Sequence, residues 1–286
     1  MTSDLRLALV GGAVELSPSP AMHRAAMAAT GRRGDYEVVS VDDADLDGCL
    51  AALRDRDVIG VNVTIPHKQA VLRTVTRLAS GAAAAGAVNT LCADGAGWVG
   101  HNTDATGLAR MLAPYPLDGA TAVILGAGGM ARAAVVGLRS RCAQLIVVNR
   151  HAGRAAAMVE SLRDSGKGPL GPVARLTTVA ATDLDALVRA LGAASILINA
   201  TSVGMHDPLA SPLPSPVGLG SVRLVCDAVH TPRWTALLRR AEASGATVLD
   251  GLGLLAAQAA DSFALWTGER VPDAVFRGAV PVPSSA

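Results

Sequence analysis

The sequence predicts an α/β protein of two domains, each with helices flanking a mainly parallel sheet. Three observations support this fold class. The chain has 286 residues, half of them are hydrophobic, and short apolar runs alternate with helical patterns along most of its length. A chain of this length accommodates two domains of ordinary size. Strands that alternate with helices are typical of parallel sheets covered by helices.

The first hundred residues contain five apolar runs that predict strands and a set of amphipathic segments that predict helices. The predicted strands are 5–10, 36–41, 60–64, 88–91 and 98–99. The predicted helices are 21–30, 45–54, one that begins near Pro66, and 103–112. We expect Gly31 to end the first helix, and Asp104 to lie in the first turn of the last one.

The stretch 114–119, which is rich in proline and ends in glycine, interrupts this pattern and indicates a domain boundary. A second series of strands and helices follows it. Its predicted strands are 121–125, 144–148, 196–199, 224–229 and 247–250. We expect a surface loop at 209–220, an apolar helix at 253–267, and a turn of no evident role at 165–169.

Composition and charge exclude several classes of function. The formal net charge of +1 gives no indication of binding to nucleic acid or to a membrane surface. No apolar run approaches the ~20 residues that span a bilayer. The six histidines lack metal-ligand spacing, so no metal site is expected. The four cysteines are far apart and the first residues lack a signal-peptide pattern, which together predict reduced thiols in a cytoplasmic protein.

A glycine-rich turn joins a predicted strand to a predicted helix at 123–131. Gly126 permits a tight turn, Gly128 lets the backbone approach a pyrophosphate, and the small Ala131 allows close packing of the helix. The phosphates would bind free N–H groups at the helix N-terminus. The alternative is a glycine-rich turn in a fold that binds nothing there.

The next strand ends at Asn149 and Arg150, with Arg154 one helical turn later. Sites that prefer NAD usually carry an acidic residue here for the ribose hydroxyls. Two guanidinium groups instead suit a 2′-phosphate, which predicts NADP. The alternative is a pair of ordinary surface arginines. After a later strand, Thr201, Ser202 and Val203 are candidates to line the nicotinamide side of the cofactor.

Lysine is scarce in this chain, which has only Lys68 and Lys167 among 25 basic residues. A lysine in a partly dry cleft can release and recover a proton, which an arginine cannot do. Lys68 follows a short strand, where α/β proteins tend to bind ligands. The alternative is a solvated lysine in the first turn of a helix.

Short polar side chains recur at predicted strand ends and loop tips, namely Ser17, Ser19, Asn62, Thr64, Asn89 and Asp104. Each alone is explained as a turn or helix-cap residue. If the strands share a sheet, the set faces one edge and suits a small polyhydroxylated acid. Lys68 and Asp104 would then form a proton-transfer pair.

These residues belong to motifs that resemble the shikimate dehydrogenase family. The matching segments follow the family order over almost the whole chain, at 17–23, 62–68, 86–90, 102–104, 126–131, 149–150 and 250–253, followed by Gln258. The resemblance implies NADPH-linked reduction of 3-dehydroshikimate to shikimate in aromatic amino-acid biosynthesis. It also implies a substrate-binding catalytic domain at 1–105, completed by C-terminal helices at 252–286, and a Rossmann domain at 106–251.

The resemblance also implies roles for individual residues. Lys68 and Asp104 would be catalytic. The implied substrate-binding residues are Ser17, Ser19, Asn62, Thr64, Asn89, Asp104, His230 and Gln258. The implied cofactor-binding residues are Gly126, Ala127, Gly128, Gly129, Met130, Ala131, Asn149, Arg150, Arg154, Thr201, Ser202, Val203, Ala228 and Gly251.

Three positions depart from the family pattern. His230 stands where a substrate-contacting tyrosine is usual, Leu254 replaces a methionine near the cofactor, and Met130 is bulky within the glycine turn. These changes leave the ring substrate open, with quinate or aminoshikimate as alternatives. A non-catalytic NADP- or shikimate-binding regulator is the alternative from another class. We expect a monomer or a homodimer.

Overall fold

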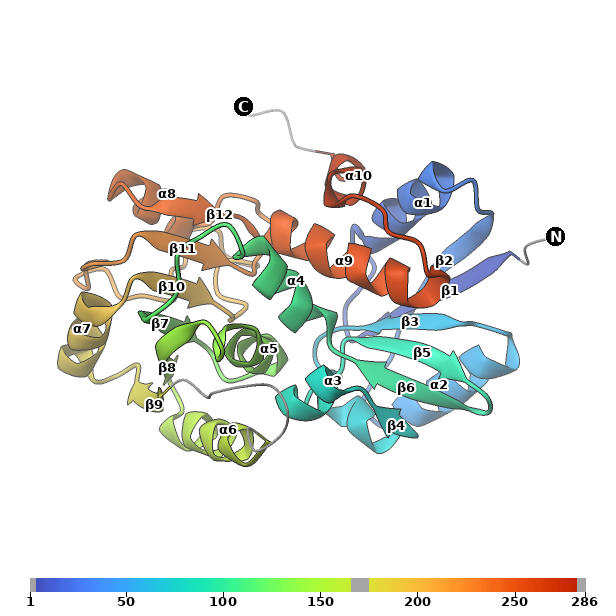
Figure 1. Ribbon diagram of the computed structural model, residues 1–286, viewed down its shortest axis with the longest axis horizontal. Helices are drawn as coiled ribbons and strands as arrows, with labels where there is room; N and C mark the ends of the chain where they lie inside the picture. Colours follow the sequence, from blue (N-terminus) through green and yellow to red (C-terminus); the bar gives the residue numbers. More distant parts are fainter. Residues whose placement is uncertain (1–3, 166–174, 282–286) are drawn as a thin grey trace. The chain divides into compact units, whose positions relative to one another are not determined.

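The computed structural model describes residues 4–165 and 175–281, which form two compact units (Figure 1). Unit 1 comprises Met1–Gly107 and Ala256–Ala286, and unit 2 comprises Leu108–Leu255. Within the described residues, each unit contains one six-stranded sheet. The predicted α/β class is thereby confirmed. Lys167 lies outside the described residues, as does most of the turn predicted at 165–169.

The sheet of unit 1 has the strand order β2-β1-β3-β5-β6-β4. Its strands are β1 (Leu5–Gly11), β2 (Gly34–Ser40), β3 (Gly60–Val63), β4 (Arg77–Leu78), β5 (Thr90–Asp94) and β6 (Gly97–His101). Strand β1 pairs in parallel with β2 and β3, whereas β5 is antiparallel to both β3 and β6. Gly95 lies at φ +54 between β5 and β6, a backbone angle that glycine adopts without strain.

The helices of unit 1 pack on this sheet or, in the case of the last helix, against the first one (Figure 1). They are α1 (Ser19–Ala29), α2 (Leu46–Asp55), the 3₁₀ helix η1 (Ala70–Arg73), α3 (Ser80–Ala85), α4 (Thr103–Met111), α9 (Gly251–Thr267) and α10 (Asp273–Gly278). Helices α4 and α9 continue into unit 2. Leu46, Leu50 and Leu53 recur at helical spacing on α2 and are fully buried in a core with β1 and β3.

Helix α9 approaches its neighbours in unit 1 closely because two glycines leave room for it. A side chain on Gly60 would overlap the ring of Trp266, whose Nε1 donates to the Leu91 carbonyl at 2.9 Å. A Cβ on Gly107 would lie 2.8 Å from the backbone nitrogen of Gln258. These contacts fix α9 beside β3 and α4.

The sheet of unit 2 is entirely parallel, with the order β12-β11-β10-β7-β8-β9. Counted from β7, this is the 3-2-1-4-5-6 order of the Rossmann fold. Its strands are β7 (Ala120–Leu125), β8 (Cys142–Asn149), β9 (Arg175–Ala180), β10 (Ile196–Asn199), β11 (Leu224–Asp227) and β12 (Thr247–Leu249).

Helices cover both faces of this sheet, and those in the described part of unit 2 are α5 (Gly129–Leu138), α6 (Ala152–Ser165), α7 (Leu184–Ala193) and α8 (Ala236–Ala243). Alternate residues of β7 point to opposite faces of the sheet, and each face carries its own hydrophobic core. Ala122 and Ile124 pack with α5 and α6, whereas Val123 and Leu125 pack with α7 and α8. Such strands, buried on both faces, read as continuous apolar runs.

Several sequence expectations were wrong in detail. The helix expected near Pro66 is a turn followed by η1, because side-chain and backbone groups of this segment bond to other parts of unit 1: His67 Nε2 donates to the Val41 carbonyl at 2.7 Å, and the Lys68 carbonyl accepts from Val88 at 2.7 Å. The strand expected at 88–91 begins only at Thr90. Strands β4 and β9 were not predicted.

Segment 209–220 is irregular, as expected, but three of its apolar residues, Leu213, Val217 and Leu219, are buried beneath it. The four cysteines are free thiols. Among the described helices, none combines the length and the apolar character that crossing a bilayer requires.

His23 lies in a buried aromatic cluster of unit 1. Its ring stacks on Tyr36 with centroids 4.5 Å apart and planes 7° apart, and Phe263 and Phe276 pack around it. Neither ring nitrogen has a hydrogen-bond partner among the described residues. Burial lowers the pKa of His23 from 6.5 to about 3, so the imidazole stays neutral in the folded protein.

Acidification should therefore destabilise the wild-type protein more than a His23→Leu variant. Below pH 6.5 the unfolded chain binds a proton at His23 that the folded chain excludes, down to about pH 3. Each pH unit in this window removes about 1.4 kcal/mol from the free energy of unfolding. Urea titrations at pH 6.5 and pH 5 should show about 2 kcal/mol more loss in the wild type. Equal losses in the two proteins would contradict the assignment.

Candidate active site

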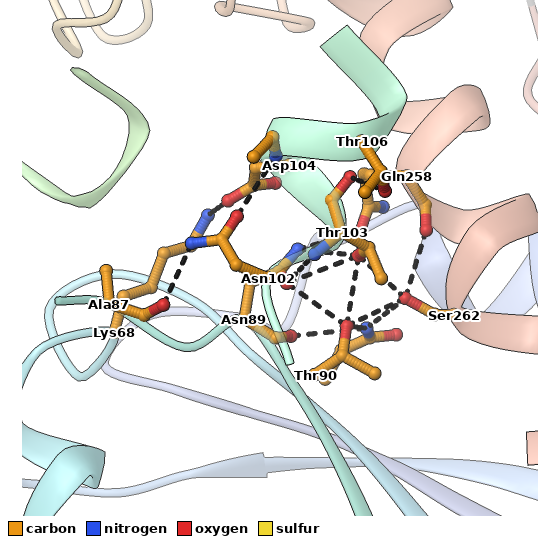
Figure 2. A network of polar contacts seen from close by, with 12 residues as sticks. Lys68, Ala87, Asn89, Thr90, Asn102, Thr103, Asp104, Thr106, Gln258 and Ser262 are labelled. Carbon is orange, nitrogen blue, oxygen red and sulfur yellow. Dashed lines mark hydrogen bonds and ion pairs between the residues drawn. The ribbon is translucent and has the colours of Figure 1, made fainter. Parts of the chain in front are cut away.

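Lys68 and Asp104 meet in unit 1 (Figure 2). Lys68 Nζ donates to Asp104 Oδ2 at 2.6 Å, and the side chains are 17% and 7% exposed. Lys68 lies in the turn after β3, and Asp104 is the second residue of α4. An ion pair this short and this sheltered from water fixes the position of the amine, because little solvent competes for either charge.

The segment 87–89 holds both partners of this pair. On one side, the Val88 N–H donates to the Lys68 carbonyl at 2.7 Å. On the other, the Ala87 carbonyl accepts from Asn102 Nδ2 at 2.9 Å, and Asn89 Oδ1 accepts the Thr103 N–H at 2.7 Å. Both of these bonds reach the N-terminus of α4. Three consecutive residues thus set the separation of Lys68 from Asp104.

Asn102 completes this arrangement because it caps α4. Its Oδ1 accepts the N–H of Ala105 at 3.0 Å, while its Nδ2 binds Ala87. The side chain is buried, at 4% exposed. An N-cap of this type orders the first helical turn, the turn that carries Asp104.

Beside the ion pair lies a buried network of hydroxyl and amide groups (Figure 2). The hydroxyls of Thr90, Thr103 and Ser262 lie 2.8–3.0 Å from one another. Asn89 Nδ2 donates to Thr103 Oγ1 at 2.9 Å and to Gln258 Oε1 at 3.3 Å. The network therefore joins β5, α4 and α9.

Asn62 enters the same network from β3. Its Oδ1 accepts from the Tyr36 hydroxyl at 2.8 Å, and its Nδ2 lies 3.2 Å from Thr90 Oγ1 and 3.1 Å from Ser262 Oγ. Asn62 and Asn89 are 6% and 2% exposed, and protein groups engage both ends of each amide. Their geometry suits positioning of the surrounding groups.

The other predicted substrate residues of unit 1 lie at strand and helix ends. Ser17 Oγ donates to Ser19 Oγ at 3.1 Å and accepts the Ser19 N–H at 3.3 Å, at the start of α1. Thr64 follows β3 and is half-buried. A Cβ on Gly11 would come within 2.5 Å of the Thr64 methyl group, so this glycine makes room for Thr64.

The glycine turn of unit 2 has the geometry of a phosphate-binding loop. Gly126 lies at φ +113, and its N–H donates to the Val148 carbonyl at 2.8 Å. A Cβ on Gly128 would meet no atom of the described chain within 4 Å, so the backbone is open to a ligand there. Helix α5 begins at Gly129, and Ala131 is fully buried against the sheet. These residues fit a pyrophosphate.

Arg150 and Arg154 follow β8, and both are exposed. Within residues 4–165 and 175–281, neither guanidinium forms an ion pair or a side-chain hydrogen bond with the protein. Asn149 Nδ2 donates to the His151 carbonyl at 3.0 Å, which orders the chain between the two arginines. Two exposed cations and no acid at this strand end suit a ligand phosphate.

Asp227, at the end of β11, organises two loops that the sequence reasoning did not connect. Its Oδ1 accepts from Asn199 Nδ2 at 2.8 Å and from the Val229 N–H at 2.9 Å, and its Oδ2 accepts from the Thr235 hydroxyl at 2.7 Å. Asn199 Oδ1 in turn accepts the N–H of Thr201 at 3.0 Å. Burial raises the pKa of Asp227.

These bonds shape the predicted cofactor residues that follow β10 and β11. Thr201 Oγ1 accepts the Val203 N–H at 3.1 Å, and Ser202 is exposed between them. Ala228 is half-buried next to Asp227.

His230 and Gly251 also lie in unit 2. Burial lowers the pKa of His230, and its buried Nδ1 has no hydrogen-bond partner in the part of the chain that the structure describes. A side chain on Gly251 would overlap the Val229 carbonyl, so glycine is required where α9 begins. The backbone of Gly251 therefore lies directly against the backbone of Val229 and His230.

Two residues of this arrangement, Ser262 and Asp227, went unnoticed in the sequence. Ser262 is a fully buried polar residue in a mostly apolar helix, one turn after Gln258. Asp227 is a fully buried acid at the end of a buried strand. A polar residue inside an apolar run is the signal in both, since buried polar groups require partners.

Comparison with family models matches most of the chain. Residues 9–91 match the shikimate dehydrogenase substrate binding domain, residues 107–211 match shikimate / quinate 5-dehydrogenase, and residues 251–280 match the shikimate 5′-dehydrogenase C-terminal domain. A shikimate dehydrogenase (NADP(+)) of Bacillus licheniformis is 36% identical over 267 residues, which cover 91% of this chain and 90% of the relative.

Solved structures are similar over nearly the whole chain. Shikimate 5-dehydrogenase of Thermus thermophilus, in complex with NADP(H) and shikimate, has a TM-score of 0.84 and 36% identity, covering 96% of this chain and 98% of that one. Quinate dehydrogenase of Corynebacterium glutamicum, in complex with NAD, has a TM-score of 0.84 and 30% identity, covering 97% and 99%.

Asn102→Ala should destabilise the protein more than loss of a simple helix cap. The change removes the cap of α4 and also leaves the buried Ala87 carbonyl without its side-chain donor. We expect a loss of about 2–3 kcal/mol in the free energy of unfolding. Asp183→Ala is the matched control, because Asp183 caps α7 through a single exposed bond to Ala186. Its expected cost is about 1 kcal/mol. Equal losses in urea titrations would argue against the second role of Asn102.

Proposed function

The chain belongs to the shikimate dehydrogenase family, and on this premise we propose that Lys68 and Asp104 are its catalytic pair. The protein is an NADP-dependent oxidoreductase that acts on a CH–OH group and reduces 3-dehydroshikimate to shikimate. One observation carries the proposal for the two residues: a sheltered amine and a carboxylate 2.6 Å apart, both anchored by the segment 87–89.

Reduction of a ketone requires a hydride at carbon and a proton at oxygen. NADPH supplies the hydride when bound. The Lys68 ammonium donates the proton from Nζ to the oxygen that becomes the hydroxyl, and Asp104 Oδ2 holds that ammonium by accepting its hydrogen bond. In the reverse direction the neutral amine of Lys68 takes the proton back.

The ring acid engages groups of four chemical kinds, namely hydroxyl, carboxylate, amide and imidazole. The hydroxyls of Ser17 and Ser19 bind its carboxylate. Thr64, Asp104 and Gln258 bind its ring hydroxyls. The family resemblance also assigns Asn62 and Asn89 to the substrate. Because protein groups engage both ends of each amide, we propose that these two residues instead hold the other groups in position. His230, with a lowered pKa, offers a neutral imidazole to the substrate.

The glycine turn and the arginines of unit 2 hold NADP. The first N–H groups of α5 bind the pyrophosphate, and Arg150 and Arg154 bind the 2′-phosphate. The remaining cofactor contacts come from Gly126, Ala127, Gly128, Gly129, Met130, Ala131, Asn149, Thr201, Ser202, Val203, Ala228 and Gly251. This proposal is supported by the open space at Gly128 and by two exposed cations that the described residues leave unpaired.

The substrate-binding domain is proposed to comprise residues 1–105 with 252–286, and the dinucleotide-binding domain residues 106–251. We propose the cytoplasm as the location, supported by four free thiols. A monomer or a dimer of identical chains is proposed as the functional form.

Quinate and aminoshikimate are the alternative substrates. Assays with shikimate, quinate and aminoshikimate and NADP, and with the corresponding ketones and NADPH, test the assignment of shikimate directly.

Lys68→Ala should lower kcat by about 100-fold or more, because the proton donor to the forming hydroxyl is lost. The KM for NADPH should stay within about twofold, since the cofactor residues are untouched. Steady-state oxidation of NADPH with 3-dehydroshikimate measures both constants.

Lys68→Arg is the matched variant, because it keeps a cation beside Asp104 but cannot release a proton near neutral pH. It should be nearly as slow as Lys68→Ala. Wild-type turnover in either variant would remove Lys68 from the proton-transfer step.

Arg150→Ala should weaken NADP binding about tenfold and leave NAD binding almost unchanged, because only NADP carries the 2′-phosphate. Arg189→Ala on α7 controls for the loss of an exposed arginine. Calorimetry with the two dinucleotides gives the ratio. An equal effect on NAD and NADP would sink the 2′-phosphate assignment.

A further inference from the structure

The hydroxyl of Ser262 is the point at which four parts of unit 1 meet (Figure 2). Ser262 is fully buried on α9. Its Oγ lies 3.1 Å from Asn62 Nδ2 on β3, 2.8 Å from Thr90 Oγ1 on β5 and 3.0 Å from Thr103 Oγ1 on α4. It also lies 3.0 Å from the Gln258 carbonyl, one turn earlier on its own helix.

Hydrogen-bond directions in the network can be followed outward from Thr103. The Thr103 N–H must donate, so Asn89 turns its Oδ1 toward it at 2.7 Å. Asn89 Nδ2 then faces Thr103 Oγ1 at 2.9 Å and Gln258 Oε1 at 3.3 Å. The carbonyl end of Gln258 is therefore the end turned toward Asn89. The orientation of the Gln258 amide therefore depends on the Asn89 amide. Asn89 in turn contacts the Thr103 hydroxyl, which is hydrogen-bonded to Ser262.

Loss of the Ser262 oxygen would leave the hydroxyls of Thr90 and Thr103 with one partner fewer in a buried setting. Both hydroxyls would turn toward the remaining acceptors, Asn89 Oδ1 and Gln258 Oε1, since unsatisfied buried donors are costly. Thr103 Oγ1 already lies 3.2 Å from Asn89 Oδ1 and 3.5 Å from Gln258 Oε1. The competition would act on the side-chain amides of Asn89 and Gln258, of which Gln258 is proposed to bind the ring hydroxyls.

We propose that Ser262 is a positioning residue for recognition of the ring substrate. It acts through Thr103 and Asn89 on the orientation of Gln258, and it touches neither the cofactor nor the reacting atoms. The inference rests on the proposed function, because Gln258 is assigned there to the ring hydroxyls. Helix α9 thus contributes a contact residue and, one turn later, the hydroxyl that orients it.

The test compares Ser262→Ala with the wild-type enzyme in steady-state assays. We expect the KM for 3-dehydroshikimate to rise about fivefold, as for loss of one net hydrogen bond. The KM for NADPH and kcat should stay within about twofold. Thr267→Val is the matched control, because the Thr267 hydroxyl also donates to the carbonyl one turn earlier on α9, at 2.7 Å to Phe263, but lies outside the network.

A second variant keeps the test decisive if Ser262→Ala folds poorly. Thr103→Val removes the relay hydroxyl and keeps the Thr103 N–H bond to Asn89. Thr103→Val should also raise the KM for 3-dehydroshikimate. In the double variant, Ser262→Ala with Thr103→Val, the fold-increase in this KM should be smaller than the product of the two single increases, because both changes act through the same hydrogen bonds.

Three outcomes overturn the assignment. They are a shift of less than twofold in the KM for 3-dehydroshikimate, equal shifts in both KM values, and fully multiplicative effects in the double variant. An inactive wild-type enzyme would overturn the proposed function itself, and the Ser262 assignment with it. An active wild type with an unshifted Ser262→Ala variant would overturn the assignment alone.

Discussion

The segment 87–89 is the constraint on which the catalytic geometry depends. Its backbone fixes the Lys68 turn on one side, and its carbonyl and amide groups fix the N-terminus of α4 on the other. A flexible lysine would otherwise lose much of its rotamer entropy to hold a single position. Here the ion pair is short because rigid backbone places both partners in advance, which is the arrangement that proton transfer requires.

The same unit also buries a cluster of polar side chains close to the ion pair. Unit 1 places amides and hydroxyls from four elements in one interior cluster, where each unpaired group would be costly. The cluster is tolerable because its groups satisfy one another: Asn62 reaches the Tyr36 hydroxyl, and Ser262 closes the triangle with Thr90 and Thr103. An interior satisfied in this way specifies a single arrangement, which suits a site that must recognise several hydroxyls at once.

The sequence alone predicted the α/β class, the glycine turn and most strands, because apolar runs bounded by glycine or proline are local signals. It also singled out Lys68 and Asp104, which the structure brings together. It missed Ser262 and Asp227 because their roles arise from residues far away along the chain. The helix expected after Pro66 failed for the same reason, since bonds from His67 to Val41 and from Val88 to Lys68 override local preference. Strand β9 was missed because polar residues interrupt its apolar pattern.

The scarcity of lysine has a practical consequence for spectroscopy. A protein grown with isotope-labelled lysine would carry the label at just two side chains, Lys68 and Lys167. The amine resonance of Lys68 would report on its ion pair with Asp104. The charge state of a group in the active site could thus be followed directly in solution, through titration and ligand binding, almost without resonance assignment.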